Sequence, residues 1–300
     1  MIEKYLNFHE LSSKAGDIDP QNSMFHYLCD KFELNREQRL WLAFLFGMTY
    51  CGPTVFYIYN EFPDFENVDV ERLSDWWTSN KKRLVFQKDR LRVKTSDLFV
   101  ETFVSYKTLV GQRTQEAFFK GLSEAGDNPR VRYRKIFDFL EKNLRNFGRF
   151  SLFIYMELLK EIGEIDIWPD RLGVEDAKVV RTGLCYALGL PESFQTKALD
   201  KYKKKYLEKR FLDLVEEVKT RDPGAHIWSV ETSLCAFKKF VHGKRYVGYY
   251  IQRQGLEISK MKQNVPKGVD WRFLLRYRQE TFNKNFLGSK PEGHPRQSRL

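Results

Sequence analysis

The chain has 300 residues, of which 42% are hydrophobic and 30% charged, and its formal net charge is +11. This composition is globular, and the length suffices for one large helical domain or two smaller ones with a sizeable core. No run of 18 apolar residues occurs, and "MIEKYLNFHE" lacks the basic and apolar regions of a signal peptide, so we expect no membrane association.

Helical periodicity is evident from Asn35 onward. Asn35 and Gln38 have the spacing of a capping box, which predicts the start of a core helix with apolar residues through Met48. The stretch "CGPT" (51–54) should break or kink that helix. Further helices are predicted within 64–80, 96–111, 112–122, 131–145, 150–162, 174–188, 195–220, 228–241 and 270–283.

Residues 80–94 carry seven basic residues and one acid, and their apolar positions suit a short strand or a loop. Other strand signals are few, so the predicted fold class is mainly α, with at most a short β element here. We expect a single large helical domain over 1–287, which would also be compatible with two helical lobes. Residues 288–300 are predicted to be a disordered basic tail.

The positive charge is concentrated near the end of the sequence. Residues 238–300 hold 15 Lys and Arg against 4 Asp and Glu, a net of +11, so the remainder has 36 of each and is neutral. Such a basic segment indicates a polyanion partner, and the presence of apolar and aromatic positions within it favours nucleic acid over a solvated tail. We therefore predict DNA binding with steep salt dependence.

Four cysteines stand at positions 29, 51, 185 and 235. They form no C-x-x-C motif and no close pairing with histidine, so their spacing fits neither a zinc site nor an iron–sulfur cluster. The pattern is typical of a reduced, cytosolic chain.

The stretch "NLRNFGRFSLFIYMELL" (143–159) predicts a helix end, a tight turn and a new helix. Gly148 permits backbone angles that other residues resist, and the first N–H groups of the new helix can donate hydrogen bonds to a phosphate. Arg145 and Arg149 flank the turn, as in a helix-hairpin-helix element that holds a DNA backbone. An ordinary corner between two helices is the alternative interpretation.

Two carboxylates follow this helix. Asp166 lies 18 residues after Gly148 and Asp170 lies 22 after it. In helix-hairpin-helix DNA glycosylases a catalytic aspartate follows the hairpin glycine by roughly twenty residues, so this spacing resembles that pattern. Bifunctional members carry a lysine two residues after the glycine, where this chain has Phe150, which disfavours an imine-forming lyase. A surface loop is the other interpretation of the two aspartates.

Three blocks carry a second resemblance: "LWLAFLFGMTYCGPTVFYIYNEFP" (40–63), "ETSLCAFKKFVHGKRYVGYY" (231–250) and "KGVDWRFLLRYRQETF" (267–282). They resemble the α-glutamyl/putrescinyl thymine pyrophosphorylase family, the phage amino acid:DNA transferases, thought to be related to DNA glycosylases. The likeness covers most of residues 25–285. It implies a helix-hairpin-helix, glycosylase-like helical fold and a location in the cytoplasm of an infected bacterial host.

The family's reaction replaces the pyrophosphate of 5-pyrophosphoryloxymethyluracil in DNA with the amine of an amino acid or polyamine, producing hypermodified thymine. The implied partners are double-stranded DNA carrying that base and the amine co-substrate, and we expect a monomer. No cofactor is implied, and Mg²⁺ would enter only with the pyrophosphate.

The resemblance and the chemistry together suggest a set of site residues. The base should flip into an aromatic pocket, the leaving group needs cations, and a carboxylate should deprotonate or position the amine. A cysteine at position 51 or 235 would serve a mechanism with transient addition at C6. The candidates are Asp166, Asp170 and Cys235 for catalysis; Lys238, Lys239, Lys244, Arg245, Arg145, Gly148 and Arg149 for pyrophosphate or DNA; and Trp168, Arg171, Tyr246, Tyr249, Asp270 and Trp271 for the pocket.

Two other functions remain open at this point. One is a monofunctional DNA glycosylase that excises a base with Asp166 or Asp170. The other is a non-catalytic DNA-binding protein whose basic C-terminal part only contacts phosphates.

Overall fold

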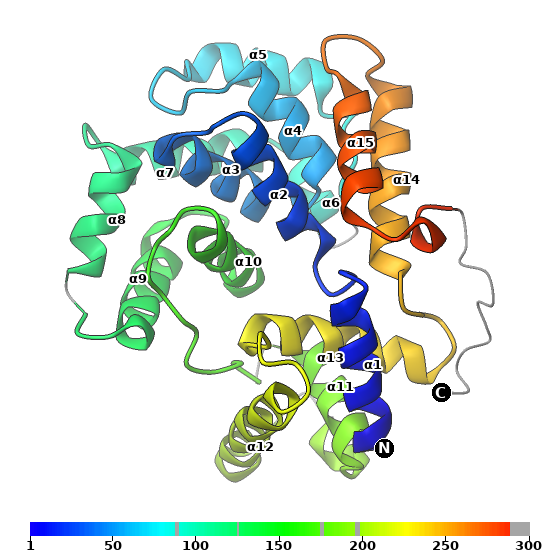
Figure 1. Cartoon of the computed structure of the whole chain (residues 1–300). Coiled ribbons are helices and arrows are strands. Elements are labelled where there is room, and N and C mark those ends of the chain that lie inside the picture. The colour runs from blue at the N-terminus through cyan, green and yellow to red at the C-terminus, as the bar shows by residue number, and fades with distance from the viewer. Residues whose placement is uncertain (88–89, 125, 175–176, 196–198, 289–300) are drawn as a thin grey trace. The chain divides into compact units, whose positions relative to one another are not determined.

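A computed structural model describes residues 1–87, 90–124, 126–174, 177–195 and 199–288 (Figure 1). Within these ranges the chain forms fifteen α-helices and no β-strand, which confirms the predicted mainly α fold class. The chain divides into two compact units. Unit 1 comprises Met1–Pro20, Arg171–Arg253 and the described part of Arg278–Leu300, and unit 2 comprises Gln21–Asp170 and Gln254–Tyr277.

Unit 2 is built around α3 (Arg36–Thr49), whose residues from Leu40 to Thr49 are all buried. The capping box at its start is present as predicted: Asn35 accepts from the backbone of Gln38, and Gln38 accepts from the backbone of Asn35. The helices around it are α2 (Pro20–Lys31), α4 (Gly52–Glu61), α5 (Val70–Asn80), α6 (Leu91–Thr95), α7 (Leu98–Val110), α8 (Gln115–Ser123), α9 (Pro129–Asn143) and α10 (Arg149–Glu161).

Helix α3 packs closely on α10 in this unit. A Cβ at Gly47 would lie 2.9 Å from the Phe147 ring and 3.0 Å from Cβ of Tyr155, so only glycine leaves room there. The Phe44 and Tyr106 rings stack 4.2 Å apart in the same core, which holds α7 against α3. These contacts explain why so many aromatic residues occur in this part of the sequence.

The short β element considered for residues 80–94 is not found among the described residues. Turns follow α5, and Leu91–Thr95 is the short helix α6. The described backbone groups of this segment bond within local turns or to side chains and not to a partner strand. The Arg83 N–H donates to the Asn80 carbonyl at 2.8 Å, and the carbonyl of Leu84 accepts from Lys94 Nζ at 2.6 Å. A strand needs a neighbour to complete its ladder, and this segment has none in the described chain.

Unit 1 contains α1 (Ile2–Lys14), α11 (Lys178–Leu188), α12 (Lys201–Lys219) and α13 (Ile227–Val241), with short 3₁₀ helices at Glu192–Phe194 and Lys284–Phe286. Helix α13 is its centre, and α1, α11 and α12 pack against it. The backbones of α11 and α13 approach so closely that a Cβ at Gly183 would lie 2.1 Å from the Leu234 carbonyl oxygen. Phe8 of α1 contacts Phe240 of α13, with ring centroids 4.5 Å apart.

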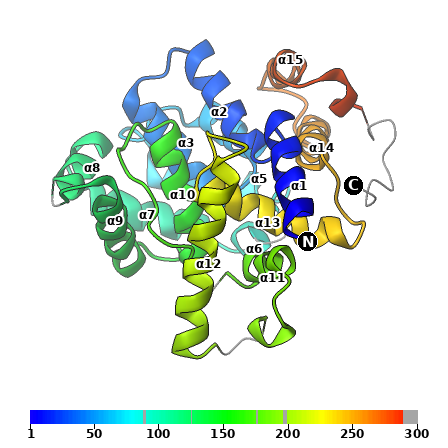
Figure 2. The ribbon, with the colours of Figure 1, turned by 60° about the horizontal axis from the view of Figure 1, so that its bottom comes forward.

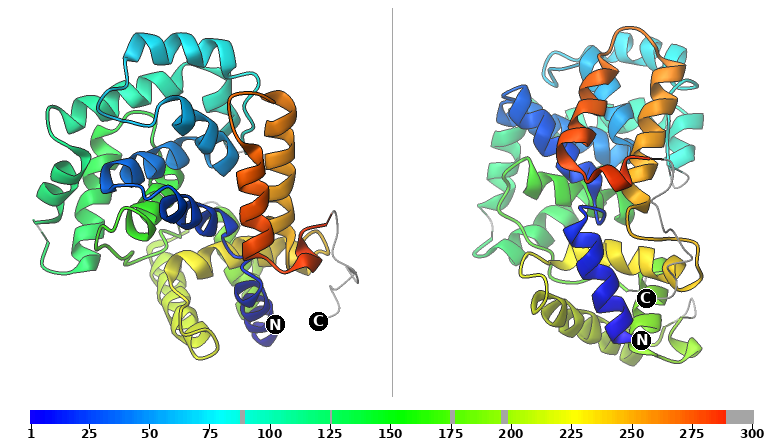
Figure 3. Two further views of the ribbon diagram at one scale, coloured as in Figure 1. Left: turned by 45° about the horizontal axis from the view of Figure 1, so that its top comes forward. Right: turned by 45° about the vertical axis from the view of Figure 1, so that its right-hand side comes forward.

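The stretch between the two predicted C-terminal helices is itself largely helical. It forms α14 (Tyr249–Asn264), where the sequence pattern indicated only an aromatic and basic segment, and α15 (Trp271–Thr281) follows. Figure 3 shows α14 and α15 side by side in both views. The unit boundary falls inside each of these two helices. Residues 289–300 of the predicted disordered tail lie outside the described residues.

Candidate functional site

The helix end, turn and new helix predicted for residues 143–159 are present. Helix α9 ends at Asn143 and α10 begins at Arg149, with Gly148 as its N-cap. The backbone reason given for Gly148 is wrong, because its φ is −81°, which any residue adopts, and the left-handed residue of the turn is Asn146, with a φ of 62°. Arg145 is exposed beside this helix start, and the Arg149 guanidinium lies 5.4 Å from the centre of the Phe153 ring. A DNA contact at this turn stays a prediction.

Asp166 forms an ordinary surface ion pair. Its side chain is 64% exposed and pairs with Arg132 of α9, which also donates Nε–H to the Asp166 backbone carbonyl at 2.8 Å. An exposed pair of this kind contributes little to stability, and it leaves no unsatisfied group that requires a ligand.

Asp170 differs from Asp166 in burial and in pairing. Its side chain is only 10% exposed, and its ion pair is with Arg134 of α9 and not with the adjacent Arg171, which is exposed. The hydrogen bond from Arg134 to Asp170 raises the pKa of that guanidinium. The second carboxylate oxygen, Oδ1, is buried without a hydrogen-bond partner among the described residues. Nearby, Lys160 Nζ lies 5.0 Å from the centre of the Trp168 ring, and that ring is partly exposed.

Several predicted residues of unit 1 gather around Arg245. The Arg245 side chain is 8% exposed, and its guanidinium lies 4.2 Å from the Tyr249 ring centre and 4.3 Å from that of Tyr250. Its Nε and Nη1 groups are buried and have no acceptor within the described part of the chain. A buried cation whose N–H groups lack acceptors is costly, so this arrangement indicates a site for an anionic ligand.

Asp17, which no sequence motif singled out, lies near this guanidinium. It is 2% exposed and accepts three backbone N–H groups, from Gly248 at 2.8 Å, Tyr250 at 2.8 Å and Ile251 at 3.0 Å. Burial raises the pKa of the Asp17 carboxyl to about 7. The three N–H groups and Arg245 act in the opposite direction and lower this pKa, because they favour the ionised form. Asp17 therefore anchors the turn that carries the two tyrosines, at the start of α14.

Other candidates of unit 1 lie outside the Arg245 cluster, which we define as Asp17, Arg245, Tyr249 and Tyr250. Tyr246 donates its hydroxyl to Gln252, and its ring meets that of Tyr249 edge-on at 5.6 Å. Cys235 is partly buried on α13. Burial raises the pKa of Tyr250, and the neighbouring Arg245 opposes this shift. Of the lysines, Lys238 is half-buried, and two more are exposed, namely Lys239 and Lys244.

The remaining pocket candidates lie in unit 2. Asp270 is exposed and accepts Nε–H of Arg272 at 3.1 Å, a bond that lowers the pKa of the carboxyl. Trp271 is buried and donates its indole N–H to the Val265 carbonyl at 2.7 Å. Cys51, the other thiol considered for C6 addition, is fully buried at the start of α4. Each of these residues has an ordinary structural environment.

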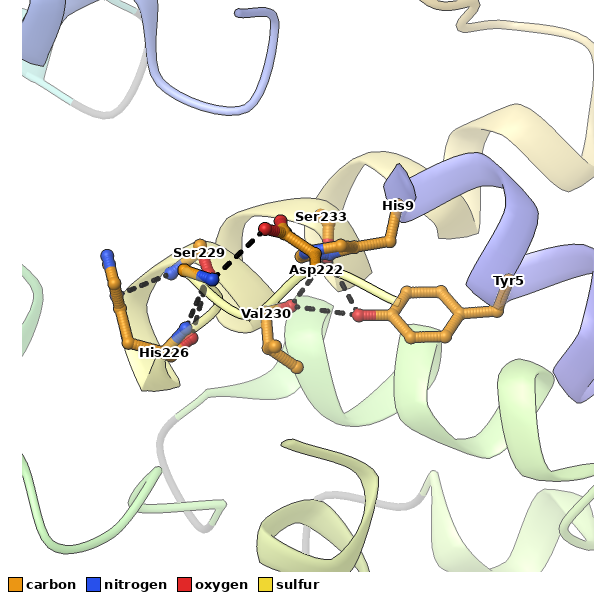
Figure 4. A network of polar contacts seen from close by, with 8 residues as sticks. Tyr5, His9, Asp222, His226, Ser229, Val230 and Ser233 are labelled. Atoms are coloured by element: carbon orange, nitrogen blue, oxygen red, sulfur yellow. Dashed lines mark hydrogen bonds and ion pairs between the residues drawn. The ribbon is translucent and has the colours of Figure 1, made fainter. Parts of the chain in front are cut away.

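A second buried polar group in unit 1 has the order of a Ser-His-Asp triad. Figure 4 shows Tyr5 and His9 reaching from α1 toward Ser233 of α13. His9 Nδ1 is 2.9 Å from Ser233 Oγ, and its Nε2 is 3.3 Å from Asp222 Oδ2. The Tyr5 hydroxyl is 2.8 Å from Ser233 Oγ. We call these four residues, Tyr5, His9, Asp222 and Ser233, the His9 network.

Geometry makes the His9 network structural and not nucleophilic. A neutral His9 with its proton on Nε2 can donate to Asp222 and accept the Ser233 hydroxyl proton, while Tyr5 donates to Ser233, so each polar atom has a partner. Ser233 is 2% exposed, which leaves no path for a substrate to its oxygen. The network joins α1, α13 and the turn before α13.

The described residues contain no group of three or more His, Cys, Asp or Glu side chains arranged to hold a metal ion. None of the helices in the described ranges combines the length and apolar character that crossing a membrane requires.

Comparisons with known proteins agree with the predicted family. A family model described as amino acid:DNA transferase matches residues 13–246, a range that includes both Asp17 and Arg245. The chain is similar to a serinyltransferase of Salmonella phage ViI, with 29% identity over 264 residues, which cover 77% of this chain and 60% of that protein. The chain thus spans about three fifths of the length of this relative. No solved structure matches.

The match of the family model over most of the chain, together with the three sequence blocks, shows the family: this chain belongs to the amino acid:DNA transferases.

Proposed function

We propose that the protein transfers the amine of an amino acid or polyamine to 5-pyrophosphoryloxymethyluracil in double-stranded DNA and releases pyrophosphate. In this reaction the amine nitrogen bonds to the C5-methylene carbon as the bond from that carbon to the pyrophosphate oxygen breaks. The pyrophosphate leaves with the bonding electrons, and the proton lost by the ammonium passes to a carboxylate or to water. The product is a hypermodified thymine.

The Arg245 cluster is the observation that carries this proposal. The leaving group gains negative charge as its bond breaks, and a buried donor aimed at that charge stabilises the transition state more than the ground state. Arg245 offers two N–H groups that have no acceptor among the described residues, in a place nearly closed to solvent. Low exposure strengthens its interaction with an anion, because less water screens the charge.

The surrounding residues have roles that follow from their positions in unit 1. The three lysines at 238, 239 and 244 would hold the outer phosphate oxygens, since they lie at or near the solvent-exposed end of α13. The Tyr246 and Tyr249 rings would flank the flipped base. Asp17 is a positioning residue, because it fixes the turn that holds Arg245 between its two rings.

In unit 2, Asp170 is our candidate for accepting a proton from the amine or for positioning it. Its buried, unpartnered Oδ1 has the chemistry of a base, whereas both the side chain and the backbone carbonyl of Asp166 already accept from Arg132. Trp168 is the candidate aromatic wall beside it. The Gly148 turn with Arg145 and Arg149 would hold the DNA backbone, as in glycosylase-like proteins.

The phage relative is named a serinyltransferase, so serine should be tested first, alongside glycine, glutamate and putrescine. An amino-acid substrate has a carboxylate that suits an arginine fork, and the exposed Arg171 is the residue predicted to take it.

The decisive experiment incubates the protein with duplex DNA containing 5-pyrophosphoryloxymethyluracil and each amine in turn. Pyrophosphate is measured directly, and the nucleosides are identified by mass spectrometry after digestion. We expect pyrophosphate and an amine-substituted thymidine in equal amounts. Release of a free base would indicate a glycosylase, and DNA binding without either product would indicate a non-catalytic binder. Either result would overturn the proposed function.

A further inference from the structure

We propose that the N-terminal half of α12, residues 201–210, binds the phosphate backbone of double-stranded DNA. This inference rests on the proposed function, because that function makes DNA the partner. It concerns a basic surface that the total charge conceals, since residues 1–237 are neutral in sum.

The charge of this half-helix is high and one-sided. Residues 201–210 ("KYKKKYLEKR") contain six Lys and Arg and one Glu, a net of +5, whereas residues 211–219 ("FLDLVEEVK") contain one Lys and three acids, a net of −2. A helix carries partial positive charge at its N-terminus, where acids are stabilising and bases are not. The charges of α12 are therefore placed unfavourably with respect to its dipole, so they do not stabilise the helix.

The lysines of this half-helix form no ion pairs with described residues. None of the five lies within ion-pair distance of a carboxylate in the described part of the chain, and Arg210 is 3.9 Å from Asp213. The one acid, Glu208, is already used: its two oxygens accept the backbone N–H groups of Leu172 at 3.0 Å and Val174 at 2.7 Å. The positive charge is thus available to an external anion.

Three of these lysines are arranged as a stripe. Lys201, Lys205 and Lys209 are all exposed and are spaced four residues apart, so they share one face of the helix, with about 6 Å between successive positions. Like charges at this spacing repel one another, by about 0.2–0.5 kcal/mol for a pair on an isolated helix. A polymer of closely spaced phosphates would relieve this repulsion along its whole length.

The rest of the helix makes this stripe a rigid surface. The opposite face buries Leu207, Phe211, Leu214, Val215 and Val218 and packs against α13. The 19-residue helix can be followed along its length in Figure 2. Tyr202, beside Lys201, is 75% exposed, and its ring stacks on that of Tyr206 at 6.4 Å. Tyrosine hydroxyls and lysines are among the groups that contact phosphates and sugars in protein–DNA complexes.

The test compares two triple variants of the full-length protein that remove the same charge. The stripe variant is Lys201→Gln/Lys205→Gln/Lys209→Gln. The control variant is Lys14→Gln/Lys81→Gln/Lys219→Gln, in which each lysine has an ion-pair partner, namely Glu10, Asp97 and Glu216. Affinity for an unmodified duplex of about 30 base pairs is measured from low to moderate salt, a range in which backbone contacts dominate binding.

We expect the stripe variant to bind at least tenfold more weakly at low salt. The slope of log affinity against log salt should fall by about 0.9 for each phosphate that the variant no longer neutralises, while the control variant stays close to the wild type. The melting temperature should not fall, because the removed charges repel one another. The turnover of modified DNA at saturation should also be unchanged, with a higher KM for DNA.

Equal affinity and equal slope for the two variants would overturn the inference. So would stripe-dependent binding to vesicles containing phosphatidylserine that is stronger than binding to DNA at the same salt, because it would identify a membrane surface as the partner. The proposed function is tested separately: a wild type that binds DNA through the stripe but forms no amine product would contradict the function and leave this inference standing.

Discussion

Two buried polar clusters of unit 1 differ in whether their hydrogen bonds are complete. In the His9 network each donor and acceptor has a partner within the protein, and the network joins α1 to α13. In the Arg245 cluster the Arg245 guanidinium is also buried, but its Nε and Nη1 groups have no acceptor in the described chain. Because burying unpaired polar groups costs free energy, the first cluster is explained by folding alone, whereas the second keeps donors that an anionic ligand would satisfy.

The comparison also applies in unit 2. The Asp166 carboxylate is exposed and paired, like an ordinary surface group, whereas the Asp170 side chain is only 10% exposed and its buried Oδ1 is unpartnered among the described residues. Completeness of bonding thus separates two aspartates that their spacing from Gly148 does not separate. Four predictions test this criterion.

The largest effect is expected from Arg245→Met. Loss of one buried donor at a developing oxyanion typically lowers kcat by about 10²–10³-fold. Stability should stay within about 1 kcal/mol of the wild type, because the loss of two cation–π interactions is offset by removing a buried charge with two unsatisfied N–H groups. Single-turnover pyrophosphate release and urea unfolding measure the two effects. Normal turnover with a strong loss of stability would show that Arg245 is structural. The Arg245 cluster would then not differ in role from the His9 network.

The second prediction contrasts Asp170→Asn with Asp166→Asn. Asparagine keeps the shape and removes the charge, so Asp170→Asn should slow transfer by about 10²-fold or more if the carboxylate acts as a base. Asp166→Asn should change the rate less than about threefold, since an exposed ion pair contributes about 0–1 kcal/mol. Both variants should bind DNA as the wild type does. Pre-steady-state pyrophosphate release compares the two variants. If both release pyrophosphate at the wild-type rate, neither aspartate is the base, and the block around Asp270 becomes the next candidate.

Ser233→Ala should lower stability and leave the rate of transfer unchanged, which is the opposite of the result expected for Arg245→Met. It removes the partner of His9 Nδ1 and the nearest partner of the Tyr5 hydroxyl, so the free energy of unfolding should fall by about 2–4 kcal/mol. The rate of transfer per folded molecule should not change at a temperature where the variant is folded. A catalytic defect in folded Ser233→Ala protein would mean that the triad-like order is functional.

The smallest effect is a pH dependence of stability. Burial lowers the pKa of His9 below its ordinary value of 6.5, although Asp222 opposes this shift. The unfolded chain therefore binds the proton more readily, and the contribution of His9 to stability is lost as the pH falls through 6.5 toward the folded pKa. Urea unfolding of the wild type between about pH 7.5 and 5.5 should show this decline, and His9→Gln should show a weaker one. A decline of the same size in both proteins would exclude His9 as its source.

The sequence by itself determined the helical class, most helix positions and the family. Local signals suffice for these features: a capping box at Asn35 forms between residues three apart, and periodic apolar positions identify the face that a helix buries. The three blocks that resemble the transferase family are also continuous in the chain. The basic segment from residue 238 pointed to Arg245, whereas the charge of α12 was hidden because acids elsewhere cancel it in the sum.

Only the tertiary structure decided which of these charged residues have unsatisfied polar atoms. Asp17 and Tyr250 are 233 residues apart, and no local pattern predicts that this aspartate anchors the turn holding Arg245. Asp166 and Asp170 have similar sequence surroundings, yet they pair with different arginines of α9 and end in different environments. Whether a polar group is satisfied depends on contacts between distant segments, and such contacts exist only once the helices have packed.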